Sequence, residues 1–582
     1  MHIGRLPLAL ALALALAIGA RTAAAANTSV GAGETLTLTQ NLVLVDGDTF
    51  DAEGTADAPC TIEGAGFSIS AAEGWMGSFT ARHCTFHSVG TTANHALELS
   101  ISGTGEIRIE DSTFDACADV IITTFDGPSV EILRNTVLDN SLVAAPVNSN
   151  DNTVPAFTLQ GYANTVEKHF QGNHVYRSRV HIEAAQNWII GGYNPGEGNV
   201  MIGIRAGVDA RGTNVKIVGN YIHVLPDDLN GWNQVKPLST LEGPFLVEHN
   251  VIRDGNWLVD IASEAEIRYN LLADSHDRPW LILENVDKNE KVHHNVFVRH
   301  KMQFPVYGMW VLRPAGTTTA EVYNNTFHGG GACHVETLPA LAVQDGAFLA
   351  SLRSNAFVGF SNTGANAGIV GSMEGIVTPA PERLGYADYN LFSNPRAAKD
   401  NYTVAVAGKR ERLDPGFALN DAPAGGAVDD QVMDPGFSAD RIPVQFPYND
   451  DDIKAGTTTV CQILAFYRTL FEPKSGSPML GTGDPADGTG NNIGAIGGAD
   501  DQFGKLCAGG DVGSPDLSEA TYTCPKLPPG TGTGGTGPPT SHGFVCVCDV
   551  AAAPSPGSLA VAALGAVWLL LRRRARRSRH VI

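Results

Sequence analysis

The stretch VGNYIHVL (residues 218–225) decides the fold, because its pattern returns along most of the chain. Each copy has a few alternating apolar residues, an asparagine, and one or two further apolar residues. Copies with the asparagine are LRNTVLDN at Asn135, QGNHVYRS at Asn173, VGNYIHVL at Asn220, EHNVIRDG at Asn250, RYNLLADS at Asn270, HHNVFVRH at Asn295, YNNTFHGG at Asn325, RSNAFVGF at Asn355 and YNLFSNPR at Asn390. Two earlier copies lack it, HCTFHS at Cys84 and DSTFDA at Ser112. Short period-two strands that return every 20–35 residues predict a β-solenoid.

The recurring asparagine predicts an internal ladder, with Asn220, Asn250, Asn270, Asn295, Asn325 and Asn355 as its members. A sharp bend between two strands needs a residue that tolerates left-handed backbone angles, and asparagine does so best after glycine. Its side-chain amide can also hydrogen-bond to the asparagine of the next coil. These asparagines are therefore expected to be structural.

The repeat resembles the right-handed parallel β-helix family, the pectate-lyase-like fold, over about residues 35–500. The resemblance implies an all-β solenoid, in a domain that we place at residues 27–500. LDPGFA at Leu413, MDPGFS at Met433 and the glycine-rich segment from Gly476 resemble, in this order, the closing segment of bacterial surface β-helix proteins. They predict that the solenoid ends near Gly498. The spacing of ILAFYRTLF (463–471) predicts a helix that covers the last coil.

The two ends of the chain predict export and processing. Residues 1–26 combine a basic start, an apolar run and small residues, which is the layout of a cleaved secretory signal. Residues 501–545 contain cysteines and a Pro/Gly/Thr-rich spacer. Residues 546–582 hold Cys546, Cys548, a short apolar run and six arginines, and they resemble the myxobacterial C-terminal sorting tags (MYXO-CTERM type). The tag implies sorting machinery as a partner, one C-terminal membrane segment before processing, and a location at the cell surface, in the outer envelope or outside the cell.

The charge excludes one class of partner. The chain has 39 Lys+Arg and 61 Asp+Glu, a net charge of −22. The signal holds two arginines, and the tail six arginines and one aspartate, so the remainder has 31 basic and 60 acidic residues, near −29. Such a surface repels polyanions at long range. Nucleic acid is therefore not expected as a partner, and a polyuronate substrate is disfavoured unless cations bridge the charges.

Seven cysteines precede the tag, and export permits disulfides. Cys507 and Cys524 are close enough in sequence to suggest a late bridge. Cys60, Cys84 and Cys117 are predicted to stack in one interior column instead. The odd number leaves at least one cysteine free or paired between molecules.

Tryptophans recur once per coil. Trp257, Trp280 and Trp310 share a context, NWLVDI, PWLILE and MWVLRP, and are expected to begin the same strand in successive coils. One interpretation is an outer aromatic platform for flat sugar faces, with Arg313 beside it. The other is an aromatic stack inside the solenoid. Both faces of these strands are apolar, so alternation does not choose between the two interpretations.

Charged residues crowd the same coils. Because the resemblance is to a fold that includes polysaccharide lyases, we expect a base and a group that neutralises a uronate carboxylate. Arg278, His276 and Lys301 are the candidate basic group, and Asp254, Asp260 and Asp277 are the candidate calcium ligands. A solvated outer face is the alternative. The Trp-Ile-Asp-His motif of pectate lyases and the companion motifs of polygalacturonases are absent, so the enzymatic resemblance is to the fold alone.

The sequence thus predicts an exported, surface-anchored or released β-helix protein that contacts a polysaccharide or surface glycan as a binding or adhesion module. A polysaccharide lyase acting in a groove is the second interpretation, preferred to a glycoside hydrolase. A structural stalk without a ligand is the third.

Overall fold

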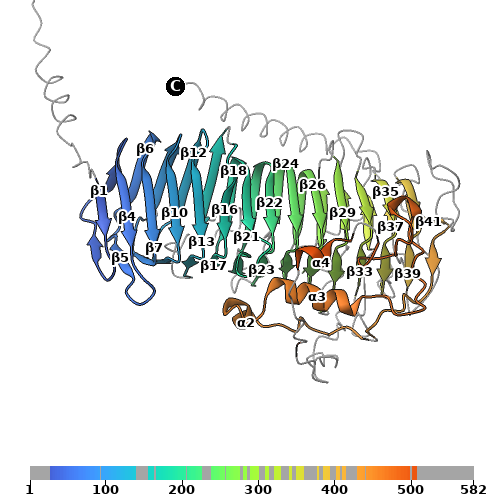
Figure 1. Cartoon of the computed structure of the whole chain (residues 1–582). Coiled ribbons are helices and arrows are strands. Elements are labelled where there is room, and N and C mark those ends of the chain that lie inside the picture. Colours follow the sequence, from blue (N-terminus) through green and yellow to red (C-terminus); the bar gives the residue numbers. More distant parts are fainter. Residues whose placement is uncertain are drawn as a thin grey trace, which may run out of the picture.

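The computed structural model describes residues 27–507 and 515, except for 92, 139–154, 163–164, 205, 226–237, 256, 276–278, 285–288, 301–308, 313–319, 330–339, 344–348, 360–375, 379–383, 394–401, 407–408, 414–428, 440 and 499–500. The signal and tag segments lie outside these residues. The chain winds into an elongated parallel β-helix, which runs from β1 to β41 in Figure 1. Each coil contributes strands to three walls, in the order wall 1, wall 2, wall 3. Among the described residues, no helix is long and apolar enough to span a bilayer.

Walls 1 and 2 are joined into one sheet by two long strands, β24 (Leu238–Glu248) and β26 (Val259–Arg268), that pass through both. The other strands of wall 1 are β3 (Leu42–Leu44), β6 (Ile69–Trp75), β9 (Leu97–Ser102), β12 (Val120–Phe125), β15 (Phe157–Tyr162), β18 (Arg179–Gln186), β21 (Gly207–Thr213), β28 (Leu281–Glu284), β31 (Met309–Leu312), β34 (Leu341–Val343), β37 (Ile376–Thr378) and β40 (Tyr402–Val406). Those of wall 2 are β1 (Asn27–Val30), β4 (Thr49–Glu53), β7 (Ser78–Arg82), β10 (Glu106–Glu110), β13 (Ser129–Leu133), β16 (Lys168–Gln171), β19 (Trp188–Gly191), β22 (Val215–Val218), β29 (Glu290–His293), β32 (Glu321–Tyr323), β35 (Leu349–Arg353) and β38 (Leu384–Asp388). A last strand, β41 (Lys409–Leu413), pairs antiparallel with β40.

Wall 3 is a separate parallel sheet. Its strands are β2 (Thr35–Thr37), β5 (Cys60–Glu63), β8 (Cys84–His87), β11 (Thr113–Asp115), β14 (Thr136–Val137), β17 (His174–Tyr176), β20 (Val200–Gly203), β23 (Tyr221–Val224), β25 (Val251–Arg253), β27 (Leu271–Ala273), β30 (Val296–Val298), β33 (Thr326–His328), β36 (Ala356–Val358), β39 (Leu391–Ser393) and β42 (Gln431–Val432). Because the strands of successive coils are in register, side chains of the same type stack on one another inside the solenoid. The rings of Phe297, Phe327, Phe357 and Phe392, for example, form a continuous buried stack. Parallel stacking of apolar side chains therefore builds the core.

An asparagine ladder runs along the turn between walls 2 and 3. Each Nδ2 donates to the Oδ1 of the next asparagine, for example from Asn250 to Asn270 at 3.0 Å and from Asn270 to Asn295 at 2.9 Å. The same Oδ1 also accepts the preceding backbone N–H, so both ends of every amide are satisfied away from water. The described ladder comprises Asn135, Asn173, Asn199, Asn220, Asn250, Asn270, Asn295, Asn325, Asn355 and Asn390, and it ends on Asp430.

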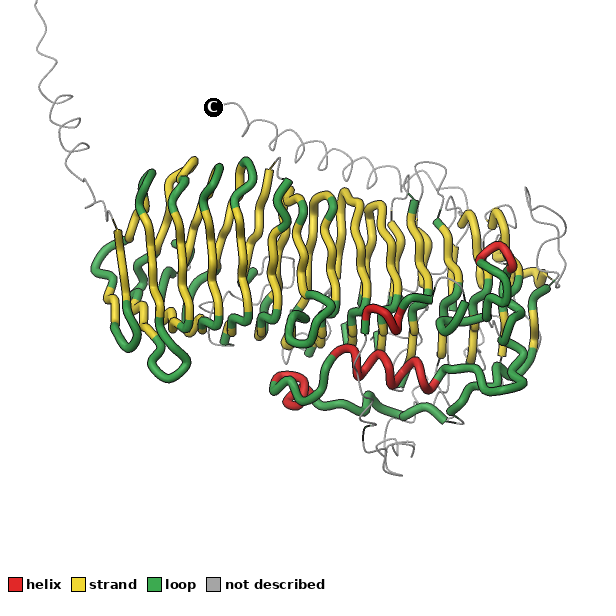
Figure 2. Tube along the Cα trace, in the orientation of Figure 1, coloured by secondary structure: helices red, strands yellow, loops and turns green. Residues whose placement is uncertain are grey.

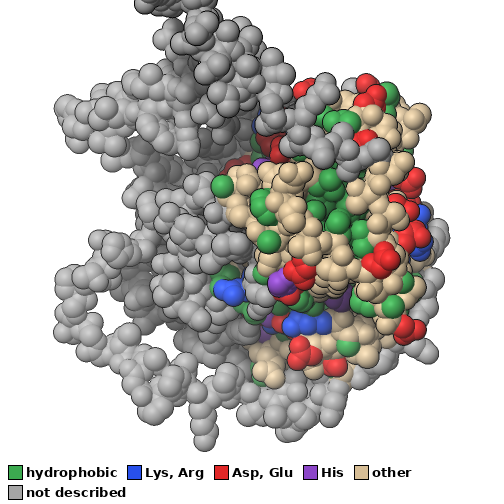
Figure 3. Space-filling model, turned by 90° about the vertical axis from the view of Figure 1, so that its left-hand side faces the viewer, with side chains coloured by type: hydrophobic (Ala, Val, Ile, Leu, Met, Phe, Trp, Pro, Cys, Tyr) green, Lys and Arg blue, Asp and Glu red, His purple; other side chains and the backbone are tan. Residues whose placement is uncertain are grey.

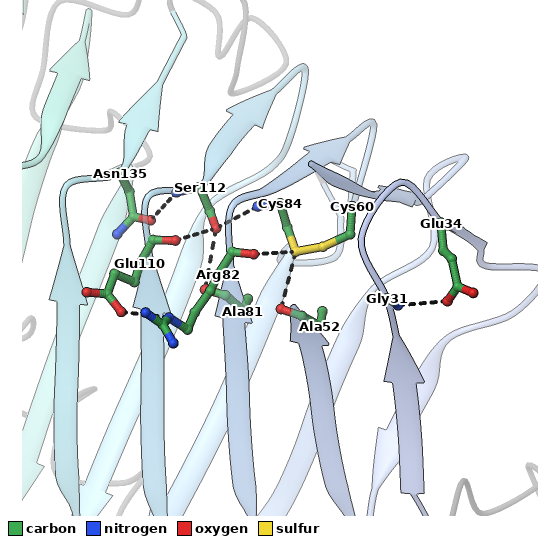
Figure 4. Close-up of a disulfide and its surroundings, with 10 residues drawn as sticks. All are labelled: Gly31, Glu34, Ala52, Cys60, Ala81, Arg82, Cys84, Glu110, Ser112 and Asn135. Atoms are coloured by element: carbon green, nitrogen blue, oxygen red, sulfur yellow. Dashed lines mark hydrogen bonds and ion pairs between the residues drawn. A yellow bond between two sulfur atoms is a disulfide. The ribbon is translucent and has the colours of Figure 1, made fainter. Parts of the chain in front are cut away.

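The first coils continue this column with other residues (Figure 4). The backbone N–H of Ser112 donates to Asn135 Oδ1, and Ser112 Oγ accepts from the backbone N–H of Cys84. Cys84 is disulfide-bonded to its register partner Cys60. The expectation that Cys117 shares this column is wrong. It follows β11, and its buried thiol approaches the carbonyl oxygen of Phe86 at 3.1 Å.

The left-handed residue of these turns is not the asparagine, contrary to expectation. It is the residue before it, for instance His249 at φ 55°, Tyr269 at φ 57° and His294 at φ 55°. The two residues have different roles at the turn: the first adopts the left-handed backbone angles, and the asparagine makes the ladder hydrogen bonds. The bend turns the chain one residue earlier, so that the asparagine side chain points inward to the ladder.

A C-terminal strap, formed by the described residues between 433 and 507, folds back along the outside of wall 3 (Figures 1 and 2). It carries α2 (Asp450–Lys454), α3 (Val460–Leu470), a short 3-10 turn (Pro485–Asp487) and α4 (Phe503–Leu506). Ile463, Leu464 and Tyr467 of α3 pack on the outward apolar residues of wall 3. The helix predicted at 463–471 is therefore present, but it covers the side of the solenoid rather than its last coil.

Buried polar contacts hold the strap in place. Tyr467 hydroxyl lies 2.7 Å from His300 Nε2, and His300 Nδ1 lies 2.9 Å from Asp274. Arg353 forms an ion pair with Asp487 at 2.7 Å. The predicted Cys507–Cys524 bridge is wrong, because Cys507 is bonded to Cys461 at the start of α3.

Two buried histidines lie where the strap crosses the turns between walls 2 and 3. The ring of His249 stacks on Phe503 of α4, with 5.4 Å between centroids. His294 lies beside Tyr269, at 5.3 Å. Burial lowers the pKa of each imidazole to about 3. Both rings are therefore neutral in the folded protein at mild acid pH.

Acidification should weaken the folded state through these two rings. An unfolded histidine takes up a proton below its ordinary pKa of 6.5, whereas the folded one does not until about 3. The stability is thus complete above pH 6.5 and falls as the pH drops towards 3, by at most about 1.4 kcal/mol per pH unit for each ring. Urea titrations of the wild type and His249→Phe at several pH values measure this. The substitution should flatten the slope, and equal slopes would contradict the prediction.

Candidate functional site

The predicted basic group falls where the structure gives no description. Arg278, His276, Lys301, Arg313 and the predicted calcium ligand Asp277 all lie outside the described residues. The tag residues Cys546 and Cys548 do too. These assignments stay predictions.

The tryptophans do not form one outer row. Trp280 is 3% exposed and packs in the core near Phe297, 6.0 Å between ring centroids. Its ring is therefore unavailable to a ligand at the surface, in keeping with the interior interpretation. Trp257 is half-buried. Residue 310 is described by its backbone alone, in register with Ile282 and Ala342 on wall 1.

The two described calcium candidates, Asp254 and Asp260, lie in different parts of the structure. Asp254 forms an ion pair with Arg253 at 2.7 Å and lies 3.3 Å from His223, next to the strap. Asp260 lies buried on wall 1, in register with Ser239. Within the described part of the chain, no three His, Cys, Asp or Glu side chains gather in a way that holds a metal ion. Calcium remains a prediction.

A polar strip on the outer face of wall 1 is the best-formed candidate site. We call it the wall 1 strip, and it consists of Thr123 on β12, Gln160 on β15, Arg179, His181 and Glu183 on β18, Asp209 on β21 and Ser239 on β24. Period-two alternation places these residues outward, because their neighbours Val180, Ile182, Val208 and Ala210 are buried in the core.

Parallel register brings the strip residues together. His181, Asp209 and Ser239 are direct partners on three consecutive strands. His181 Nδ1 lies 3.3 Å from an Asp209 oxygen, and Ser239 Oγ donates to the other oxygen at 3.2 Å. Arg179 lies 4.0 Å from the same carboxylate. The side chains of His181 and Asp209 are 30% and 37% exposed, so both can reach a ligand.

The charge of Asp209 is set by its neighbours. Burial alone would raise the pKa of this carboxyl group, but the hydrogen bond from His181 and the charges of His181 and Arg179 hold it below its ordinary value. The strip therefore presents a fixed carboxylate, an imidazole and a guanidinium beside neutral amide and hydroxyl groups. Such a set can hydrogen-bond sugar hydroxyls, and its imidazole can also accept a proton.

Sequence reasoning did not find this strip. The signal was available in RVHIE (179–183) and GVDAR (207–211), where polar residues alternate with apolar ones in successive coils. The register between coils was missing, because loops of unequal length separate them.

The fold and the strip define a class, a parallel β-helix protein with a polar strip on one wall. A comparison with solved structures finds similarity to a mutant of the periplasmic alginate epimerase AlgG, at 11% identity and a TM-score of 0.37, covering 55% of this chain and 77% of that one. At this level the similarity supports no argument about activity. No protein-family model and no curated protein sequence matches the chain.

Proposed function

We propose that the protein is an exported binding or adhesion module whose wall 1 strip contacts a polysaccharide. The observation that carries the proposal is a pair of outward polar rows that overlap on β18 and present hydrogen-bonding groups along the solenoid axis. One row is Thr123, Gln160 and Glu183, and the other is His181, Asp209 and Ser239. An extended glycan lying along this axis would meet one strand after another. The signal and tag segments support display at the cell surface, or release after processing.

The charges favour a neutral glycan. Acidic side chains are spread over the N-terminal end of the molecule, whereas basic ones gather in a few places (Figure 3). The wall 1 strip itself holds two carboxylates against one guanidinium and one imidazole. A polyuronate would meet net repulsion unless cations bridged it.

Removing the His181–Asp209 pair should weaken glycan binding. We expect the double variant His181→Ala/Asp209→Ala to lose about 10-fold in affinity, which is the loss expected for one or two hydrogen bonds. Affinity electrophoresis in gels that contain neutral or uronate polysaccharides measures this. The matched control is Glu167→Ala/His169→Ala, which removes a similarly exposed pair away from the strip. His169 Nε2 lies on β16 of wall 2, 3.8 Å from an oxygen of Glu167, which directly precedes that strand. Equal retardation of the two double variants would contradict the assignment.

A lyase is the second candidate, because His181 is oriented by a carboxylate and lies beside a guanidinium. In β-elimination, the imidazole would take the proton next to the uronate carboxylate, the bond to the leaving oxygen would break, and that oxygen would gain a proton. The ultraviolet absorbance of the unsaturated product reports the reaction. Its loss in His181→Ala would place the base on β18, whereas its loss in Arg278→Ala alone would favour the residues predicted from sequence.

A further inference from the structure

A cavity of about 280 Å³ lies on the other side of the molecule, between the strap and the solenoid. One wall is the turn at residues 192–198, which connects β19 of wall 2 to β20 of wall 3. The other is the strap between Ile453 and Gln462, together with the Cys461–Cys507 disulfide. The cavity is thus built from two segments far apart in sequence, and the disulfide joins two parts of the strap beside it.

Among the described residues, the lining combines glycines and the apolar side chains of Val200, Ile453 and Val460 with aromatic and polar side chains, and none of these is ionised. Tyr193 and His174 contribute rings, Asn194 and Gln462 amides, and Thr458 a hydroxyl group. Within the part of the chain that the structure describes, the lining contains no Asp, Glu, Lys or Arg. Burial, with a smaller contribution from Lys454, lowers the pKa of His174, so its imidazole is neutral at neutral pH.

Two of these groups are held in place by their own partners. The Tyr193 hydroxyl group donates to Glu248. Asn194 Nδ2 donates to Glu197 Oε1 at 2.7 Å, and the Asn194 backbone N–H donates to Glu197 Oε2 at 3.1 Å. The ring and the amide are therefore positioned before any ligand arrives, which lowers the entropy cost of binding.

Glycines let the turns of two neighbouring coils pack closely beside the cavity. A Cβ on Gly198 would lie 2.0 Å from the carbonyl oxygen of Gly219, and a Cβ on Gly219 would lie 2.2 Å from that of Gly192. At Gly196, by contrast, nothing lies within 4 Å of the added Cβ, so this edge of the turn is open. The glycines thus pack this turn tightly against the turn of the next coil and leave its edge at Gly196 open.

We infer that this cavity binds a single neutral sugar unit, as a second carbohydrate site separate from the wall 1 strip. A pyranose ring offers C–H groups to an aromatic face and hydroxyl groups to amides and hydroxyls, which matches the lining of Tyr193, Asn194, Gln462 and Thr458. The volume lies just below the usual range of small-molecule pockets, so it suits one ring rather than a polymer. The described lining residues carry no charge, which disfavours an acidic sugar.

The test is calorimetric titration of the full-length chain with glucose, galactose, N-acetylglucosamine and glucuronate. Thr458→Trp fills the cavity, and Ala455→Trp places the same bulk on an exposed residue of the same loop that does not line it. A neutral sugar should bind the wild type and Ala455→Trp, and bind Thr458→Trp at least about 10-fold more weakly. Asn194→Ala, at an exposed position, should weaken binding by a similar factor without changing the unfolding midpoint.

Three outcomes would overturn the inference. The first is no saturable binding of any of the four sugars, which would mean that the cavity holds only water. The second is equal affinity of Thr458→Trp and the wild type for the sugar. The third is tighter binding of glucuronate than of the neutral sugars. The variant His181→Ala/Asp209→Ala separates this site from the wall 1 strip, because a sugar held by that strip would be lost in this variant and kept in Thr458→Trp.

Discussion

Replacing Asn270 by alanine should lower the free energy of unfolding by about 4 kcal/mol or more, since each buried polar group left without a partner costs about 1–3 kcal/mol. Asn270 Oδ1 accepts from the backbone N–H and the Nδ2 of Asn250, both at 3.0 Å. Its Nδ2 donates to Asn295 and to the carbonyl oxygen of Val247. The substitution leaves the hydrogen-bonding groups of Asn250, Asn295 and Val247 without these partners, in a site closed to water.

Denaturant titration measures the effect, and Asn214→Gly is its control. Asn214, unlike Asn270, is at positive φ, 54°, where glycine is tolerated, and its amide contacts the exposed Asn187 side chain. This change should cost less than about 1 kcal/mol. A loss at Asn270 no larger than the loss at Asn214 would show that the ladder contributes little to stability.

Breaking the Cys461–Cys507 disulfide should produce a loss of similar size, confined to the strap. The bond closes a loop of 46 residues, for which the chain-entropy relation gives about 4 kcal/mol. We expect Cys507→Ser to leave the solenoid folded and to release the strap, so that trypsin first cuts between residues 441 and 507. Limited proteolysis followed by mass spectrometry identifies those cuts.

The control is Cys117→Ser, which changes a buried thiol of the solenoid that belongs to no disulfide. It should leave the strap cleavage pattern unchanged. If Cys507→Ser gave the wild-type pattern, the strap would be held by its buried contacts alone, such as Tyr467 with His300.

The repeat was enough to predict the solenoid and most of the ladder, because register forces the same residue type to the same place in every coil. Asn199 was missed, since GEGNVM (196–201) lacks the apolar residues that precede the other copies. The terminal rung, Asp430, was missed because it is not an asparagine. Hydrophobic periodicity likewise found the helix at 463–471, but a helical pattern does not say which surface the helix covers.

The sequence of wall 3 does indicate which of its strands the strap covers. Strands β5 and β8 of wall 3 alternate between buried and half-buried residues, whereas β20, β25, β27 and β30 are buried at every position. Continuous apolar runs indicate strands covered on both faces. For the wall 1 strip the sequence shows only the alternation in RVHIE and GVDAR, which does not give the register between strands, because loops of unequal length separate them.

The strap also orders the steps by which the molecule can fold. Tyr221 meets Asp450 across 229 residues, and the backbone N–H of Gln502 donates to Tyr269 across 233. The coils, in contrast, add one at a time by contacts with the previous coil, as in other solenoids. The surface that the strap needs is complete only after the later coils have formed. A chain that emerges with its N-terminus first would thus carry an open apolar flank on wall 3 until its last folded segment closes it, and this interval is when it is most exposed to aggregation.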